Sequence, residues 1–306
     1  MSFLHGHTDP FLKSELDLFS VPFTQTALET YRSVHYKPVS TLSDESPIEF
    51  VISSQNEDCI DLAHTMLRVN VRLTPYDKDG DALVAPVNSF LHSIFNQVDV
   101  YFNKKLVTPP NNAYPYTAYI ETLLNYGPAV KSSHSSTNLW ETDIAGEIEE
   151  LPGSKTNLAL TKRQKYLKDG KTVHLMGHLH CDAFNQDKLL LNGDEVHLRL
   201  VRAKDAFCLM YASTKNYSVS ISEATLLVRR VKVSPTVLIA HAKTLASTMA
   251  KYQITRVEVK SFTLHSGING DLLDNVILGQ LLKRIILGFA DNKAFNGDRK
   301  MIPFNF

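Results

Sequence analysis

Apolar and polar residues alternate along several stretches of this chain, and that alternation limits the fold more than any other feature. From Leu67 to Leu73 every second residue is apolar, and the same period of two continues through most of residues 217–233. A period of two is expected for a strand that buries one face and exposes the other. Seven or eight such strands at this spacing favour an antiparallel sandwich or barrel over a parallel α/β sheet. The predicted strands cover residues 48–54, 64–74, 97–103, 173–184, 195–203, 207–212 and 217–233.

Two helices are predicted among these strands. Residues 116–126 place apolar side chains on one face of a helix, and Gly127 and Pro128 end it. Ser234 and Pro235 supply the N-cap and first position of a second helix, which is predicted to connect two β units. The first helix carries no polar cluster suited to catalysis, so it is interpreted as architecture.

Composition argues against several classes of protein. Lys plus Arg and Asp plus Glu number 32 each, so the net charge is zero and no overall field draws the chain to nucleic acid. The three cysteines are widely spaced, which argues against a disulfide framework. The N-terminus lacks the apolar core of a signal peptide, and no window approaches the roughly 20 apolar residues of a membrane span. We expect a soluble intracellular protein that is not secreted.

The chain divides into four predicted parts. Residues 1–47 are polar and rich in proline, and are predicted to form an extended arm; residues 48–233 form a first β unit, and residues 234–252 a connecting helix. In residues 253–306 the β pattern restarts, with strands predicted at 254–266 and 279–292. This restart echoes the beginning of the first unit, which indicates a duplicated domain. The Ser-, Lys- and Glu-rich excursion at 128–172 is expected to form surface loops.

Histidines offer a motif with a zinc-binding interpretation. His174, His178 and His180 share one face of the predicted strand 173–184, with Cys181 on the other. A His-x-His pair on a strand can hold zinc. Further ligands at a useful spacing are not evident, so a structural role is preferred and no cofactor is predicted. His178 and His180 are therefore only weak candidates for a metal site.

Two polar runs also have competing interpretations. Residues 77–81 resemble the start of a calcium loop, but Asn88 stands where the bidentate Glu is needed, so a charged turn is preferred. The basic run 162–171 resembles a phosphate-binding patch, yet the acidic run 141–150 offsets it and nucleic-acid contact is not evident. The sequence contains no Gly-rich phosphate loop after a strand, no G-x-S-x-G and no reactive-cysteine motif. The chain is predicted not to be an enzyme.

Eight segments, in collinear order, resemble capsid proteins of Polintons, also called Mavericks, the large virus-like DNA transposons of eukaryotes. These segments are residues 15–29, 47–54, 61–69, 87–107, 111–127, 177–193, 195–210 and 240–246. The resemblance implies a double jelly-roll major capsid protein, similar in fold to those of virophages and adenoviruses. It also implies that three subunits form a pseudo-hexagonal capsomer of an icosahedral shell. Neighbouring capsomers and a penton protein would be the partners, and the virion the location.

The resemblance has one departure. Capsid proteins of this family continue beyond the motif at 303–306, so we expect the second roll to be cut short. Either the reading frame is truncated, or the last strands pair with the first roll or with another copy. Their apolar side chains would need such a partner: Leu281, Leu282, Ile285, Ile286, Leu287 and Phe289. The N-terminal arm is expected either to reach a neighbouring subunit through Phe11, Phe19 and Phe23 or to be disordered.

The preferred hypothesis is a non-enzymatic capsid subunit that works by self-association. One alternative is a single jelly-roll penton protein at the five-fold vertices of the same kind of shell. Another is a lectin-like or cupin-like β-sandwich that binds sugar or metal, with His178 and His180 in its pocket. Five side chains are predicted to lie in the core and to have no direct functional role: Phe90, Phe95, Val98, Val100 and Phe102.

Overall fold

The structure is a computed structural model of the chain. It describes residues 18–19, 24–43, 46–53, 58–75, 83–109, 111–154, 156–211, 216–265, 267, 272, 274, 276 and 282–306. The strands are β1 (Leu28–Tyr36), β2 (Ile48–Ile52), β3 (Cys59–Pro75), β4 (Val84–Pro86), β5 (Phe95–Phe102), β6 (Lys105–Leu106), β7 (Val173–His178), β8 (Val196–Arg202), β9 (Leu209–Tyr211) and β10 (Tyr217–Val233). The helices are α1 (Phe90–Ser93), α2 (Tyr114–Asn125), α3 (Pro128–Ser132), η2 (His134–Asn138), α4 (Leu158–Leu167), η3 (Lys168–Gly170), α5 (Asp205–Cys208), α6 (Pro235–Leu245) and α7 (Asn292–Phe295).

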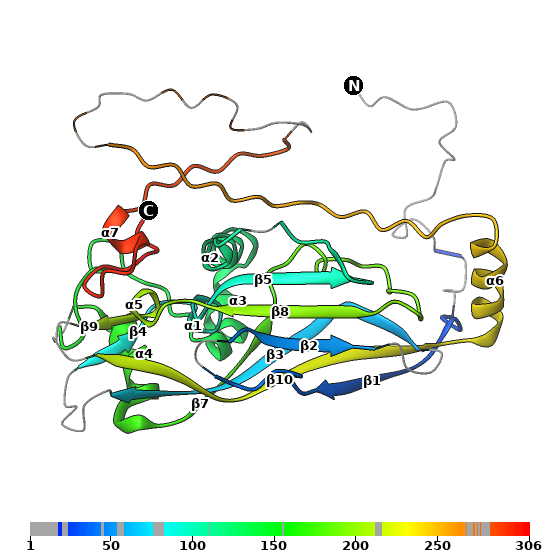
Figure 1. Cartoon of the computed structure of the whole chain (residues 1–306), viewed down its shortest axis with the longest axis horizontal. Coiled ribbons are helices and arrows are strands. Elements are labelled where there is room, and N and C mark those ends of the chain that lie inside the picture. The colour runs from blue at the N-terminus through cyan, green and yellow to red at the C-terminus, as the bar shows by residue number, and fades with distance from the viewer. Residues whose placement is uncertain are drawn as a thin grey trace.

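Eight of the strands form two four-stranded sheets, in the orders β1-β10-β3-β7 and β2-β8-β5-β6 (Figure 1). Every pair within these sheets is antiparallel. The pairs are nested along the chain, because β1 pairs with β10, β2 with β8, β3 with β7, and β5 with β6. Nested antiparallel pairs divided between two packed sheets are the strand order of a jelly roll. The predicted fold class, a mainly β jelly-roll sandwich with inserted helices, is confirmed.

The core lies between the two sheets and follows from the alternation in the sequence. Leu67 and Val69 of β3 are fully buried, and their partners in β10, Leu226 and Ala224, face the same interior. Phe50 of β2 meets them from the other sheet within the same apolar cluster. Most of the predicted core residues are confirmed as buried: Phe90, Phe95, Val98 and Val100. Phe102 is partly buried at the rim of that cluster.

Strand β1 is the main element that the sequence prediction missed. It lies within residues 1–47, which were predicted to be an extended arm, and it pairs with β10 from Leu28 to Tyr36. Most of its side chains are exposed, because β1 is the edge strand of its sheet. An edge strand that packs few side chains shows little alternation in its sequence, so the period of two gave no signal here.

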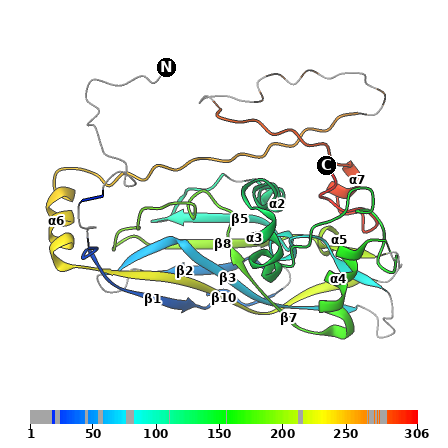
Figure 2. The ribbon, with the colours of Figure 1, turned by 180° about the vertical axis from the view of Figure 1, so that it is seen from behind.

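The excursion at 128–172 was predicted to be surface loops, and that prediction is wrong in part. It contains α3, η2, α4 and η3, and α4 begins where the Asn157 side chain accepts a hydrogen bond from the Leu160 backbone N–H at 2.9 Å. Such an N-cap satisfies one of the free amides of the first helical turn. Helix α2 lies close to its predicted bounds of 116–126. Figure 2 shows α4 near the end of the sandwich that also holds α7.

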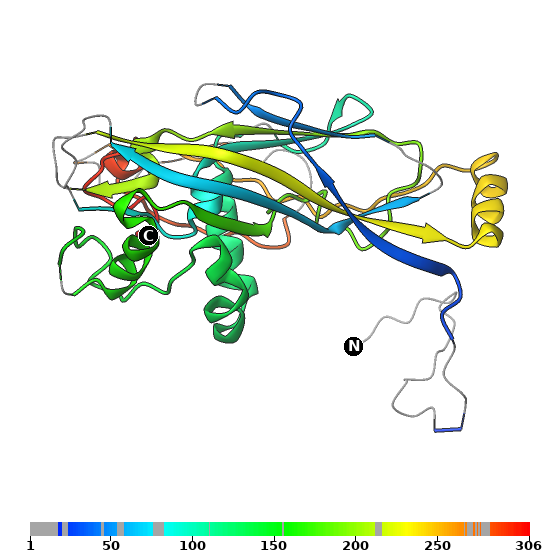
Figure 3. The same ribbon diagram turned by 90° about the horizontal axis from the view of Figure 1, so that it is seen from below.

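The residues after β10 leave the sandwich. Helix α6 begins at Pro235 as predicted but ends at Leu245, before the predicted limit of 252. Figure 3 places α6 and α7 at opposite ends of the sandwich. The strands predicted at 254–266 and 279–292 do not form in the part of those stretches that the structure describes. No neighbouring strand pairs with these described residues, and a strand needs one to satisfy its backbone. The division into two β units remains a prediction.

Candidate functional site

The two weak metal candidates, His178 and His180, do not share a strand face. Strand β7 ends at His178, which is exposed, while His180 lies in the following loop and turns towards α2. There its Nδ1 is 2.8 Å from Oε2 of Glu121, and its backbone N–H donates to the Tyr114 hydroxyl at 3.3 Å. Within the described part of the chain, no group of three or more His, Cys, Asp or Glu side chains is placed to hold a metal ion.

His180 instead belongs to a buried polar network that sequence reasoning missed. His92 of α1 lies with Nδ1 2.9 Å from the Tyr114 hydroxyl, and its ring meets the His180 ring edge-on at 4.7 Å. Burial lowers the pKa of His92 well below its usual range, so this imidazole is neutral at pH 7. The network joins α1, α2 and the loop after β7, and we interpret it as a structural connection. Separations of 22 and 66 residues between its members gave no local signal in the sequence.

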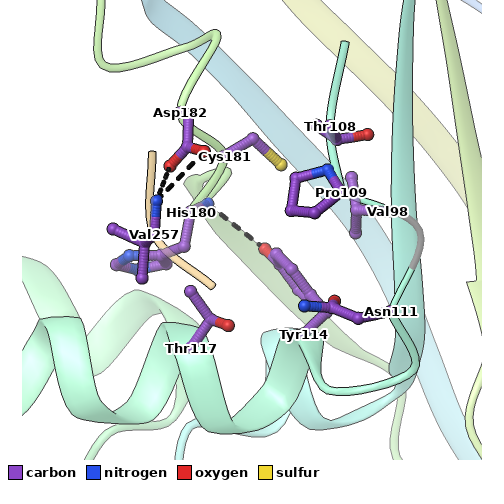
Figure 4. A pocket seen from close by; sticks show the side chains of 10 residues that line it. All are labelled: Val98, Thr108, Pro109, Asn111, Tyr114, Thr117, His180, Cys181, Asp182 and Val257. Carbon is purple, nitrogen blue, oxygen red and sulfur yellow. Dashed lines mark hydrogen bonds between the residues drawn. The ribbon is translucent and has the colours of Figure 1, made fainter. Parts of the chain in front are cut away.

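The cavities beside this network are small. Figure 4 shows the first, of about 30 Å³, lined by ten residues that include Tyr114, His180, Cys181 and Asp182. A second cavity, of about 140 Å³, is lined in part by His178. Pockets that hold small molecules are typically about 300–1,000 Å³. Burial raises the pKa of the Cys181 thiol well above its ordinary value, which keeps the thiol protonated and unreactive.

Asp182 contacts a segment far along the chain. Both of its carboxylate oxygens accept hydrogen bonds from the Val257 backbone N–H, at 3.2 and 3.3 Å (Figure 4). We call residues 251–257 the strap, because it runs back from α6 along the second sheet (Figure 1). The Tyr252 hydroxyl donates to the Leu189 carbonyl at 3.2 Å, and the Gln186 side chain donates to the Gln253 carbonyl at 2.8 Å. The strap is thus held by side chains, with no sheet ladder among its described residues.

A second apolar cluster lies at the end of the sandwich opposite α6. Part of it comes from residues that precede the strap, and we call this part the aromatic cluster. It consists of Tyr116, Tyr119, Trp140, Leu160, Phe207 and Met210. Phe304 of the C-terminal segment, residues 292–306, packs into it and is only 3% exposed. Its ring stacks on Tyr119 with the centroids 4.4 Å apart and the planes 3° apart. The last strands were expected to pair with the first roll or with another copy. The C-terminal segment instead docks on the roll through Phe304 and a backbone hydrogen bond from the Tyr211 N–H to the Arg299 carbonyl.

The basic run 162–171 does not form a uniform surface. Arg163 is fully buried and pairs with Asp143, with Nη1 3.1 Å from Oδ1. Its Nε donates to the Pro86 carbonyl at 3.1 Å. Lys162 pairs with Glu141 at the surface. The acidic run predicted to offset this basic run thus does so through two direct ion pairs, one of them buried.

The apolar side chains that were predicted to need a partner lie after the strap. Those that the structure describes are exposed. Leu287 is 84% exposed and Phe289 is 73% exposed. Leu282, Ile285 and Ile286 are also largely exposed. Within the described residues, this is a stretch of apolar surface without a cover. Phe19 is exposed as well, at 97%.

Several predictions fall on residues outside those that the structure describes. They concern Phe11 and Phe23 of the N-terminal arm, the possible calcium loop at 77–81, and Leu281. Within the described residues, no helix is long and apolar enough to span a bilayer.

No protein-family model matches the chain. The chain is 24% identical over 302 residues to the uncharacterized protein F54H12.2 of Caenorhabditis elegans, in an alignment that covers 94% of this chain and 69% of that protein.

Three solved viral structures are similar to the chain. The Sputnik virophage structure, determined by cryo-EM at 3.5 Å, has a TM-score of 0.46 at 12% identity, over 74% of this chain and 53% of that one. The Faustovirus major capsid protein gives a TM-score of 0.44 at 10% identity, over 78% and 61% of the two chains. The mavirus major capsid protein gives 0.38 at 10% identity, over 77% and 54%. The chain thus spans between half and about three-fifths of these proteins.

Proposed function

We propose that this chain is a structural capsid subunit of a virus-like element of the Polinton or Maverick type. In this proposal it self-associates into three-fold capsomers of an icosahedral shell. The observation that carries the proposal is a closed jelly roll followed by uncovered apolar side chains, among them Ile285, Leu287 and Phe289. The roll already has its own core, so covering these side chains requires a further surface. The collinear resemblance described above supports the same function.

The outer face of the β1-β10-β3-β7 sheet fits a role in lateral contacts. Charges of both signs alternate across it in ion pairs, such as Lys232 with Glu29 at 2.8 Å and Arg229 with Asp61 at 3.7 Å. Arg32 pairs with Asp58 in the same way. A face of balanced charge sets the register between neighbours without a strong net repulsion between identical copies.

No step of this function requires a catalytic residue. The polar groups around His92 and Arg163 hold elements of the fold together. The proposed partners are other copies of the chain, neighbouring capsomers and a penton protein. The proposed location is the virion, with an intracellular stage before assembly.

Electron microscopy of the purified chain over a range of concentrations tests this function. We expect particles with three-fold outlines that appear as the concentration rises, whereas five-fold rings would favour the penton alternative. Replacing Leu287 and Ile285 with Asp should abolish association, because charges would occupy the uncovered apolar stretch. Val39→Asp is the matched control, since Val39 is 66% exposed but lies outside that stretch. A chain that stays monomeric at every concentration, melts cooperatively and binds no hydrophobic dye would contradict the proposal.

A further inference from the structure

We propose that the C-terminal segment, residues 292–306, is exchanged between copies of the chain, docking into the aromatic cluster of a neighbour. This adds a specific contact to the self-association proposed above and rests on it. The occupant is identified by the structure itself, because the segment is seen docked on the same cluster within its own chain. The question is therefore which copy supplies the segment.

The receptor side is built from elements that do not depend on the segment. Tyr116 and Tyr119 lie one turn apart on α2, and Met210 belongs to β9, which pairs with β4. Phe304 contacts both tyrosines: its ring stacks on Tyr119, and it meets the Tyr116 ring edge-on at 5.7 Å. Rigid secondary structure thus presents an apolar surface that can accept a Phe side chain from any copy.

Polar contacts fix the register of the docked segment. The Tyr211 backbone N–H, on β9, donates to the Arg299 carbonyl at 3.0 Å. At the other end, the Asn305 side chain donates to Oε1 of Glu149 at 2.9 Å. Gly297, with φ of +91°, lies against Ala206, where a Cβ atom would come within 3.4 Å of that residue's backbone. These contacts make the docking specific in sequence, as recognition of a peptide by a strand edge and apolar pockets is.

The connection to the segment does not dictate which copy it reaches. Between the strap and α7 lie residues 258–291, and the described residues among them form no helix or strand. A chain of thirty-four residues can span at most about 120 Å. A globular chain of this size has a radius of gyration of only about 19 Å. A neighbouring aromatic cluster is therefore within reach.

The concentration of the protein determines whether the segment docks within its own chain or on a neighbouring copy. Docking within one chain benefits from the high effective concentration of a segment tethered to its own binding surface. Copies packed in a capsomer present their clusters at a comparable local concentration, while copies in dilute solution do not. Exchange keeps the contacts of the docked segment unchanged, which makes it a route to association that needs no new surface. We therefore expect docking within the chain in dilute solution and exchange on assembly.

Cross-linking of two full-length variants tests the exchange. One carries Asn305→Cys and the other Glu149→Cys; both positions are exposed or partly exposed, and the native cysteines are buried. A short bis-maleimide should join the two chains with a yield that rises at least tenfold between dilute and assembling concentrations. A single chain with both substitutions should cross-link internally when dilute. The control pair combines Asn305→Cys with Val39→Cys, which lies away from the cluster.

The outcomes separate this proposal from the proposed function. Cross-linking between chains above the control, together with capsomers in the same sample, supports exchange. Capsomers with no cross-linking above the control would overturn exchange and leave self-association intact. As a second measurement, Phe304→Ala chains mixed with Tyr119→Ala chains should associate more tightly than either variant alone, because one intact cluster then meets one intact segment. Equal association of the mixture and the separate variants would overturn exchange.

Discussion

The jelly roll and the residues that follow it are built from similar sequence patterns but have different structures. In the roll, β3 pairs with β10 and β7, and its alternate side chains are buried. Residues 254–265 have a comparable alternation, yet they remain unpaired and many of their side chains are exposed. The difference shows that alternation alone does not make a strand: a partner strand and an apolar surface must both be present.

The largest difference between the two regions should appear when a Phe is truncated in each. Phe50 is fully buried in β2, whereas Phe289 is 73% exposed. Phe50→Ala should lower the free energy of unfolding by about 3–5 kcal/mol, because it removes packed atoms and leaves a cavity. Phe289→Ala should change it by less than about 0.5 kcal/mol. Urea denaturation of the two variants measures both, and similar losses would show that residues after the strap belong to the same core.

A smaller loss is expected from the buried ion pair between Arg163 of α4 and Asp143. Arg163→Met leaves the Asp143 carboxylate buried without its cation. Among the described side chains its remaining hydrogen-bond partner is the Asn88 amide, which donates to Oδ2 at 2.8 Å. Removing one member of a buried pair typically costs about 3–5 kcal/mol, and the Asn88 bond should keep this cost near 3 kcal/mol. Adding Asp143→Leu should recover part of the loss, because the isolated charge is then gone.

The neighbouring surface pair supplies the control. Lys162 lies 3.3 Å from Glu141 and is 62% exposed. Lys162→Met should therefore cost less than about 1 kcal/mol. Equal losses from Arg163→Met and Lys162→Met would mean that the Arg163 pair is open to water, contrary to the structure.

How far the sequence predicts the fold depends on whether an element buries a face. The long strands β3 and β10 carry clear alternation and were predicted, whereas β1, an exposed edge strand, was not. Strands β4 and β6 are three and two residues long, too short to show any period. Beyond β10, the pattern predicts strands that lack partners among the described residues, so tertiary context decides their structure.

The candidate surfaces were less predictable than the fold. The aromatic cluster and the segment docked on it combine residues of α2, α4, β9 and the last positions of the chain, which are separated by up to about two hundred positions in the sequence. Nothing in the local sequence brings Tyr119 and Phe304 together. The contact between Asp182 and the Val257 amide could not be predicted either, because a single carboxylate in a loop does not indicate its partner. The sequence indicated that the apolar residues at 282–289 need a partner, and the structure leaves their large apolar side chains exposed.

The strap should respond to pH through Asp182. Burial raises the pKa of this carboxyl from 3.8 to about 6, and the Val257 N–H and Arg256 lower it only in part, while Glu121 and Glu258 add to the rise. When the strap leaves, Asp182 returns to water and its pKa falls back towards 3.8. The docked strap therefore binds a proton more tightly, so docking is weakest above pH 6 and strengthens as the pH falls towards 4.

Hydrogen exchange of the strap amides, corrected for the intrinsic rate, measures this response. With pKa values of 3.8 and about 6, protection should be about tenfold greater at pH 5 than at pH 7. Asp182→Asn retains an oxygen that can accept from Val257 but cannot ionise. That variant should show no such pH dependence. A pH dependence that persists in the variant would show that another group causes it.

The smallest expected effect distinguishes two tyrosines of α2. The Tyr116 hydroxyl is buried and has no hydrogen-bond partner among the described residues, whereas the Tyr114 hydroxyl accepts from the His180 backbone N–H at 3.3 Å. Tyr116→Phe keeps the ring contacts with Phe304 and removes an unpaired polar atom, so it should stabilise the docked segment by up to about 1 kcal/mol. Tyr114→Phe leaves the His180 amide without this acceptor, so it should destabilise the fold by about 1 kcal/mol. Opposite signs in thermal unfolding are the expected result. Destabilisation by both substitutions would mean that the Tyr116 hydroxyl has a partner, and water bound within the cluster would then be the first to test.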